Sequence, residues 1–232
     1  MIIAERRQRS RGNIPAMMSQ IGLGRAGGGG IAVPDWVLSG ANVDMDFVNG
    51  SYWGGTLPGM VSVARASQGY AQATNGMFTS FGNNVLRITD QGLLIEESRT
   101  NVVLWNRDLT NVAWTKTNIT AALNQIGTDG AANSASSLTS TLANGTVLQS
   151  ITLASSARFQ SVYMKRITGS GNVDMTMDNG ATWTTVSGSI NSSTYTRVTI
   201  PTQTLANPIV GFRIVTSGDA VAVDFVQNEN SG

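Results

Sequence analysis

The residues that could do chemistry in this sequence are carboxylates and aromatic rings, because its 232 residues include neither histidine nor cysteine. Without imidazole, the chain lacks the commonest general base and the commonest transition-metal ligand. Without thiols, it has no disulfides and no thiolate metal sites. A Ser–His–Asp or Cys–His centre is therefore excluded. Carboxylate-only catalysis and Ca²⁺ sites built from oxygen ligands stay open.

Carboxylate catalysis or a Ca²⁺ site would need carboxylates that lie close together, so we consider the pairs of neighbouring carboxylates. Glu96 and Glu97 are adjacent, so on a strand they would point to opposite faces and could not flank one substrate bond. Two further pairs would share a strand face, the second only if its strand is unbroken: Asp44 with Asp46, and Asp174 with Asp178. No Asp-x-Asp-x-Asp-Gly loop accompanies them. We therefore predict that the protein is not an enzyme, with no catalytic residues, no metal site and no cofactor.

Three aromatic residues near expected loops are candidates for binding a glycan. Trp53 lies beside Tyr52, Trp183 follows an Asp-Asn-Gly turn, and Tyr195 precedes an alternating run. Sugars stack their C–H faces on exposed rings, and amide side chains pair with their hydroxyls. The alternative interpretation is that these rings belong to the core or to contacts between subunits, since aromatic side chains bury large areas.

The elements that would position these residues are short β-strands. From residue 101 onward, alternating polar and apolar runs recur at roughly 8–12-residue spacing with turn residues between them. Asn179-Gly180 separates the runs 173–177 and 182–186, which is the strongest short-range signal for a hairpin. We predict an all-β fold, with an antiparallel β-sandwich or jelly roll at 101–232 and an irregular, β-rich connecting segment at 34–100.

Two details of the predicted sandwich depend on packing. In the run 145–153, Val147 and its neighbours would share one face, with Gln149 as the polar exception. Trp105 and Trp114 are nine positions apart across a turn, and we expect both to cap one end of the sandwich, since an indole buries a large area.

The composition and charge separate a basic arm from the body. Apolar residues make up 41% of the chain, enough for a packed core, whereas charged residues are only 12%, about half the usual share of roughly 25%. Within residues 1–30, five arginines and one glutamate give +4, so with a total of +1 the remainder carries −3. The glycine run 27–30 predicts a flexible joint. We predict an extended, basic anchoring arm at residues 1–33.

The arm carries the residues that we expect to anchor the protein, namely Arg6, Arg7, Arg9, Arg11, Met17, Met18 and Ile21. Clustered cations could also neutralise phosphates, but the arm has no aromatic residues for base stacking. We therefore predict pairing with acidic protein surfaces and no nucleic-acid partner. No stretch approaches the ~20 apolar residues of a membrane span, and the N-terminus lacks the apolar region of a signal peptide, so no membrane partner is expected.

The middle of the chain resembles a known family. Gly92–Asn101 resembles the "GLLIEExRTN" signature of many bacteriophage tail and head structural proteins. Upstream, Asp46-Phe47 and Arg65-Ala66-Ser67 resemble that family's opening motifs. Downstream, four segments are similar to its later motifs, so that the resemblance covers roughly residues 42–230: Trp105–Lys116, Asp129-Gly130 (without the family's preceding proline), Phe159–Lys165 and Val226–Glu229.

This resemblance implies a virion component such as a fibre, spike, decoration or minor tail protein, with a jelly roll like that of carbohydrate-binding modules. It also implies capsid, portal or tail proteins as partners, location in the virion, and a homo-oligomer, with a trimer favoured. The alternative function is that of a carbohydrate-binding module that recognises host surface polysaccharide during adsorption.

Overall fold

The structure is a computed structural model that describes residues 44–53, 61–96 and 99–230. For Asp44 and Trp53 it describes the backbone alone. The predicted anchoring residues of the arm lie outside this part of the chain. The regular secondary structure of the described residues consists of β-strands and one short 3₁₀ helix, η1 (Ser187–Ser189). No helix among them is long and apolar enough to cross a membrane.

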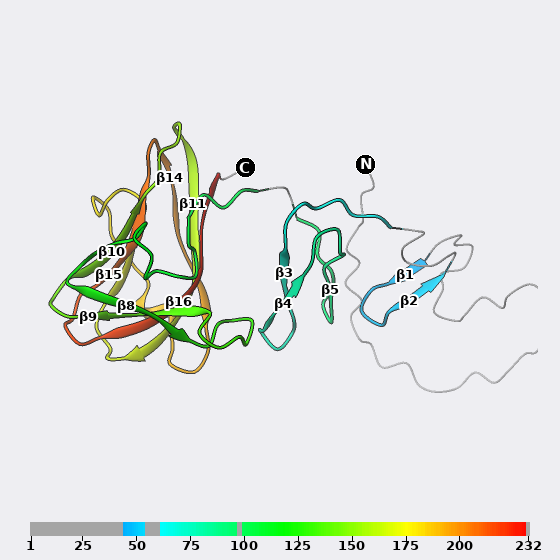
Figure 1. Cartoon of the computed structure of the whole chain (residues 1–232), viewed down its shortest axis with the longest axis horizontal. Helices are drawn as coiled ribbons and strands as arrows, with labels where there is room; N and C mark the ends of the chain where they lie inside the picture. The colour runs from blue at the N-terminus through cyan, green and yellow to red at the C-terminus, as the bar shows by residue number, and fades with distance from the viewer. Residues whose placement is uncertain (1–43, 54–60, 97–98, 231–232) are drawn as a thin grey trace, which may run out of the picture. The chain divides into compact units, whose positions relative to one another are not determined.

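Ten strands form two five-stranded sheets, drawn in green to red in Figure 1. The first, here called the front sheet, contains in spatial order β13 (Thr184–Thr185), β12 (Val173–Thr176), β15 (Ile209–Ile214), β10 (Gly145–Ser150) and β7 (Thr115–Thr117). The second, the back sheet, contains β14 (Thr196–Leu205), β11 (Ser156–Thr168), β16 (Ala220–Asn230), β9 (Ala135–Ser140) and β8 (Ile119–Gln125).

All strand pairs in both sheets are antiparallel. The predicted all-β, jelly-roll-like sandwich is therefore confirmed. The core lies between the two sheets because alternate residues of each strand point inward. Phe212 and Met175 from the front sheet join Val162, Met164 and Val223 from the back sheet in one buried cluster.

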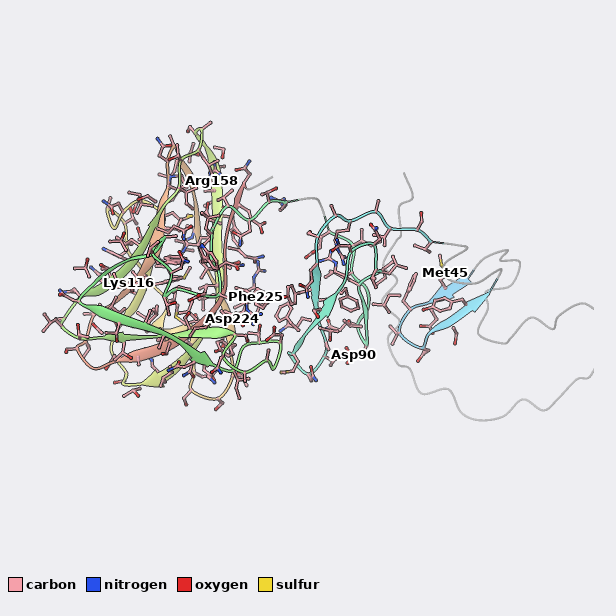
Figure 2. The ribbon with its side chains drawn as sticks, viewed as in Figure 1. Met45, Asp90, Lys116, Arg158, Asp224 and Phe225 are labelled. Carbon is pink, nitrogen blue, oxygen red and sulfur yellow. The ribbon has the colours of Figure 1, made fainter. Side chains whose placement is uncertain are left out.

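Short hairpins precede the sandwich. They are β1 (Asp44–Asp46) with β2 (Ser51–Trp53), β3 (Gly69–Gln72) with β4 (Phe78–Phe81), and β5 (Ile88–Thr89) with β6 (Gly92–Leu93). The β3–β4 hairpin contacts the back sheet through aromatic rings. The ring of Phe78 lies 5.1 Å from that of Tyr163 and 5.7 Å from that of Phe225, and Tyr70 lies 4.9 Å from Phe225. Phe225 is labelled in Figure 2.

Arg99 and Asn101 join the chain before the sandwich to the last strand, β16. The side-chain amide of Asn101 donates to the carbonyl of Val226 at 2.8 Å and accepts from the backbone N–H of Asn228 at 3.0 Å. Arg99 donates to the carbonyl of Asn230. These residues therefore hold the segment that enters the sandwich against the strand that completes it.

The loop 105–114 is closed by one tryptophan and one lysine. Trp114 is 1% exposed and stacks on Phe212, with ring centroids 6.3 Å apart. Lys116, labelled in Figure 2, places its ammonium 2.8–3.2 Å from four carbonyl oxygens of residues 109–114. The prediction that Trp105 caps the sandwich with Trp114 is wrong, because Trp105 is 57% exposed. Its backbone carbonyl accepts a hydrogen bond from the indole of Trp114.

Candidate functional site

The β12–β13 hairpin fixes Trp183 at one edge of the front sheet. Asn179 and Gly180 both adopt positive φ, at 62° and 80°, as the turn of a tight hairpin requires. The hydroxyl of Thr176 accepts from the backbone N–H of Gly180 at 2.9 Å. A Cβ on Gly180 would lie 2.7 Å from the indole of Trp183. The predicted hairpin is confirmed, and its glycine gives the indole room to pack against the turn.

A charged pair lies on the outer side of the same sheet. Asp174 on β12 and Arg213 on β15 are cross-strand partners. Arg213 contacts Asp174 Oδ2 through Nε at 2.9 Å and through Nη2 at 2.8 Å. The hydroxyl of Thr185 donates to Asp174 Oδ1 at 2.7 Å. Both carboxylate oxygens of Asp174 thus accept hydrogen bonds, and the residue is only 1% exposed.

The indole and the pair form one arrangement. The guanidinium carbon of Arg213 lies 4.5 Å from the centroid of the Trp183 ring, within the range of a cation–π contact. Arg213 keeps 27% of its side chain exposed, and its Nη1 makes no hydrogen bond within the described residues. Trp183 is also partly exposed. The outer face therefore offers a fixed ring beside a donor that is available to a ligand.

The rest of this outer face is uncharged. Register places Thr146 opposite Arg213, and Leu148 opposite Gly211. Lys116 pairs with the inward-facing Val147, so its ammonium points to the interior side of β7. The carboxylate of Asp174 balances the guanidinium of Arg213, so the face carries little net charge. Such a surface suits a ligand rich in hydroxyls better than an ionic one.

Hydrogen bonds to Asp178 hold the turn beside Trp183. Burial raises the pKa of Asp178, but hydrogen bonds from Thr182 and Thr176 outweigh that effect, and the pKa ends below its usual value. Gln203 of the back sheet reaches Asp178 Oδ2 at 3.4 Å. Among the described residues, no group of three or more carboxylates is placed to hold a metal ion.

Of the other two aromatic candidates, the structure describes the side chain of Tyr195, which does not join Trp183. Tyr195 precedes β14 of the back sheet, donates to the carbonyl of Ile126 at 3.0 Å and has Lys165 over its ring at 5.0 Å. Burial raises the pKa of its phenol. Trp53 ends β2, and its side chain lies outside the described part of the structure.

A second charged cluster ties the loops to the back sheet. Arg107 makes two hydrogen bonds to Asp129, at 2.7 and 2.9 Å, and two to the fully buried Asp224, at 2.7 and 3.1 Å. Thr128 also donates to Asp224, from both its N–H and its hydroxyl. Burial lowers the pKa of Arg107, but these bonds raise it above its ordinary value. The cluster is internally paired, so we assign it to the fold.

Sequence reasoning missed Arg213. In the structure Phe212 and Ile214 are buried in the core, so Arg213 between them faces outward. Nothing in the sequence linked it to Asp174, which is 39 positions away. Only the pairing of β12 with β15 joins them.

Solved structures with a similar sandwich are distant in sequence. The enzymatically active domain of tailspike protein 4 of bacteriophage CBA120 is 13% identical, with a TM-score of 0.40 over 56% of this chain and 21% of that chain. The CBM22-1 xylan-binding domain of Xyn10C from Paenibacillus barcinonensis is 12% identical, with a TM-score of 0.40 over 59% and 97% of the two chains.

A third example is a xylanase fragment. The CBM22-1–GH10 modules of xylanase 10B from Clostridium thermocellum, solved with xylohexaose, are 13% identical, with a TM-score of 0.40 over 57% and 28% of the two chains. This chain thus spans about a fifth of the tailspike domain and less than a third of the xylanase. No family model and no curated protein matches the sequence. These likenesses concern the sandwich fold, so function is argued from the residues.

Proposed function

We propose that the sandwich binds a neutral glycan on the outer face of the front sheet, with Trp183 and Arg213 as contacts. The observation that carries this proposal is the fixed arrangement of Trp183, Arg213 and Asp174. The indole offers apolar surface to sugar C–H groups. The free edge of the guanidinium offers donors to hydroxyl oxygens.

The pairing of Arg213 with Asp174 favours a neutral glycan over an acidic one. Asp174 neutralises Arg213 in a bond to both Nε and Nη2, so an acidic sugar would gain little from this guanidinium. The two proposed contacts, Trp183 and Arg213, are held by neighbouring residues before any ligand binds. This lowers the conformational entropy that is lost on binding. The site therefore favours neutral, hydroxyl-rich chains.

Replacement of the ring tests this proposal. The full chain and its Trp183→Ala variant are applied to an array of bacterial surface polysaccharides and neutral xylo- and galacto-oligosaccharides. We expect the variant to lose at least tenfold in affinity for any glycan that the parent protein binds. Tyr195→Ala, on the other sheet, is the matched control and should retain binding. Equal binding by the Trp183 variant would refute the assignment of the front sheet.

We also propose that the protein is a virion component, anchored by its arm and projecting the sandwich. The charge asymmetry between residues 1–30 and the remainder supports this role, as does the resemblance of residues 92–101 to phage structural proteins. A basic arm repeated on a symmetric particle would add avidity. Both proposals describe a binding protein and not an enzyme.

Deletion of the arm tests the virion role. We expect a chain lacking residues 1–30 to fold and to be absent from purified particles. Normal loading of the truncated chain onto particles would contradict the anchoring role.

A further inference from the structure

Backbone conformation singles out one exposed tryptophan. Among the described residues, eight that are not glycine have positive φ. Six of them are asparagines, which tolerate this region because their short side chain can bond locally. The other two are Phe225, at 47°, and Trp105, at 51°. For a bulky side chain this conformation is an outlier that calls for a reason.

Phe225 has such a reason within the fold. Its ring contacts those of Tyr70 and Phe78 from the β3–β4 hairpin. The guanidinium of Arg107 also lies 4.2 Å from its centroid. The strained backbone aims this ring at a packed contact, and that contact offsets the strain.

Trp105 has no comparable contact. Its side chain is 57% exposed, and within the described residues its indole makes no ring contact and donates no hydrogen bond. Packing within the described residues therefore does not offset the backbone strain at Trp105. Strained residues that persist without a packing reason occur at functional sites.

The backbone around Trp105 is nevertheless tightly held. Its carbonyl accepts from the indole N–H of Trp114 at 3.2 Å and from the N–H of Asp108 at 3.1 Å. Both backbone groups of Leu104 bond to the buried amide of Gln149, at 2.8 and 2.9 Å. The carbonyl of Asn106 accepts from Val226. The chain thus fixes three successive residues and presents the indole outward.

We infer that Trp105 is a stacking platform for a sugar ring and forms a second glycan contact, an inference that rests on the proposed glycan-binding function. The side-chain amide of Asn106 makes no hydrogen bond within the described residues and can pair with hydroxyls. The charged groups nearby are engaged within the fold, since Arg107 pairs with Asp129 and Asp224 and the carboxylate of Asp108 accepts from Thr110. An indole beside an amide, both of them uncharged groups, matches a neutral sugar.

This contact is separate from Trp183. Leu104 is anchored to β10, which lies next to the edge strand β7, whereas Trp183 precedes β13 at the other edge of the front sheet. Each tryptophan can therefore be replaced without touching the other.

Trp105→Asn tests the inference, because asparagine suits the left-handed backbone but removes the ring. Affinity for glycans on the array described above should fall at least tenfold, while the thermal midpoint rises by roughly 2–4 °C as the strain is relieved. Trp105→Phe keeps a ring and the strain, so it should retain part of the affinity without that rise. In NMR spectra, the indole N–H signal that Trp105→Asn lacks identifies Trp105. In the parent protein this signal should shift when the glycan is added.

The outcomes distinguish failure of this inference from failure of the proposed function. Glycan binding that is unchanged in Trp105→Asn but lost in Trp183→Ala overturns this inference and leaves the proposed function intact. Loss of binding in Trp105→Asn together with a lower thermal midpoint indicates a structural role and also overturns it. If the parent protein binds no glycan on the array, both proposals fall.

Discussion

Acid should remove a defined part of the stability of this protein through Asp129. Its carboxylate receives two hydrogen bonds from Arg107 and another from the N–H of Ala131. The hydrogen bonds from Arg107 are the main reason that its pKa falls from 3.8 to about 2, against an opposing effect of burial. A difference of one in pKa corresponds to about 1.36 kcal/mol, so the ionised carboxylate stabilises the fold by at most about 2 kcal/mol.

The sign of the pH dependence follows from the lowered value. Because the pKa in the folded state lies below that of the unfolded chain, the stabilisation is complete above pH about 4 and is lost as the pH falls through about 2. The Asp129 side chain keeps 15% of its surface exposed, so solvent screening makes the stated energy an upper value.

Asp129→Asn isolates this effect, because the amide has the shape of the protonated acid. We expect the free energy of unfolding of the variant to be lower than that of the parent protein by up to about 2 kcal/mol at pH 6. The two proteins should converge near pH 2. Urea titrations followed by tryptophan fluorescence measure both values without the ionic screening that guanidinium would add. A difference that stays constant from pH 6 to pH 2 would refute the reasoning.

Two further substitutions test the packing around the site. Gly180→Ala places a Cβ 2.7 Å from the Trp183 ring at φ +80°, so the free energy of unfolding from thermal unfolding should fall by at least about 1–2 kcal/mol. Gly188→Ala is the control and should be nearly neutral, because its Cβ would meet nothing within 4 Å. Trp114→Ala removes a ring that is 1% exposed and should cost about 3–5 kcal/mol in a urea titration; a cost below about 1 kcal/mol would contradict its place in the core.

Local sequence was a good guide where the signal was local. The turn at Asn179-Gly180 was predictable because few residues tolerate two successive positive φ values. The strand around Phe159–Lys165 was predictable from its alternation, and it lies within β11. The polar exception Gln149 was visible too, but its reason was not, because its partner is the backbone of Leu104, 45 positions away.

The two tryptophans of the 105–114 loop show where such reasoning stops. They have the same residue type, and their spacing suggested one shared role. Trp114 is buried against Phe212, and Trp105 is turned out by a left-handed backbone. The direction of a side chain in a loop depends on hydrogen bonds to distant strands, which residue type and spacing do not encode.

The sequence by itself determined the class of fold, the absence of imidazole and thiol chemistry, and the concentration of positive charge in residues 1–30. These follow from composition, alternation and turn residues, which act over a few positions. Only the tertiary structure decided that Asp174 meets Arg213 beneath Trp183, and that Trp105 faces solvent. The physical reason is that strand order in an antiparallel sandwich joins segments far apart in the chain, and the site is made by that order.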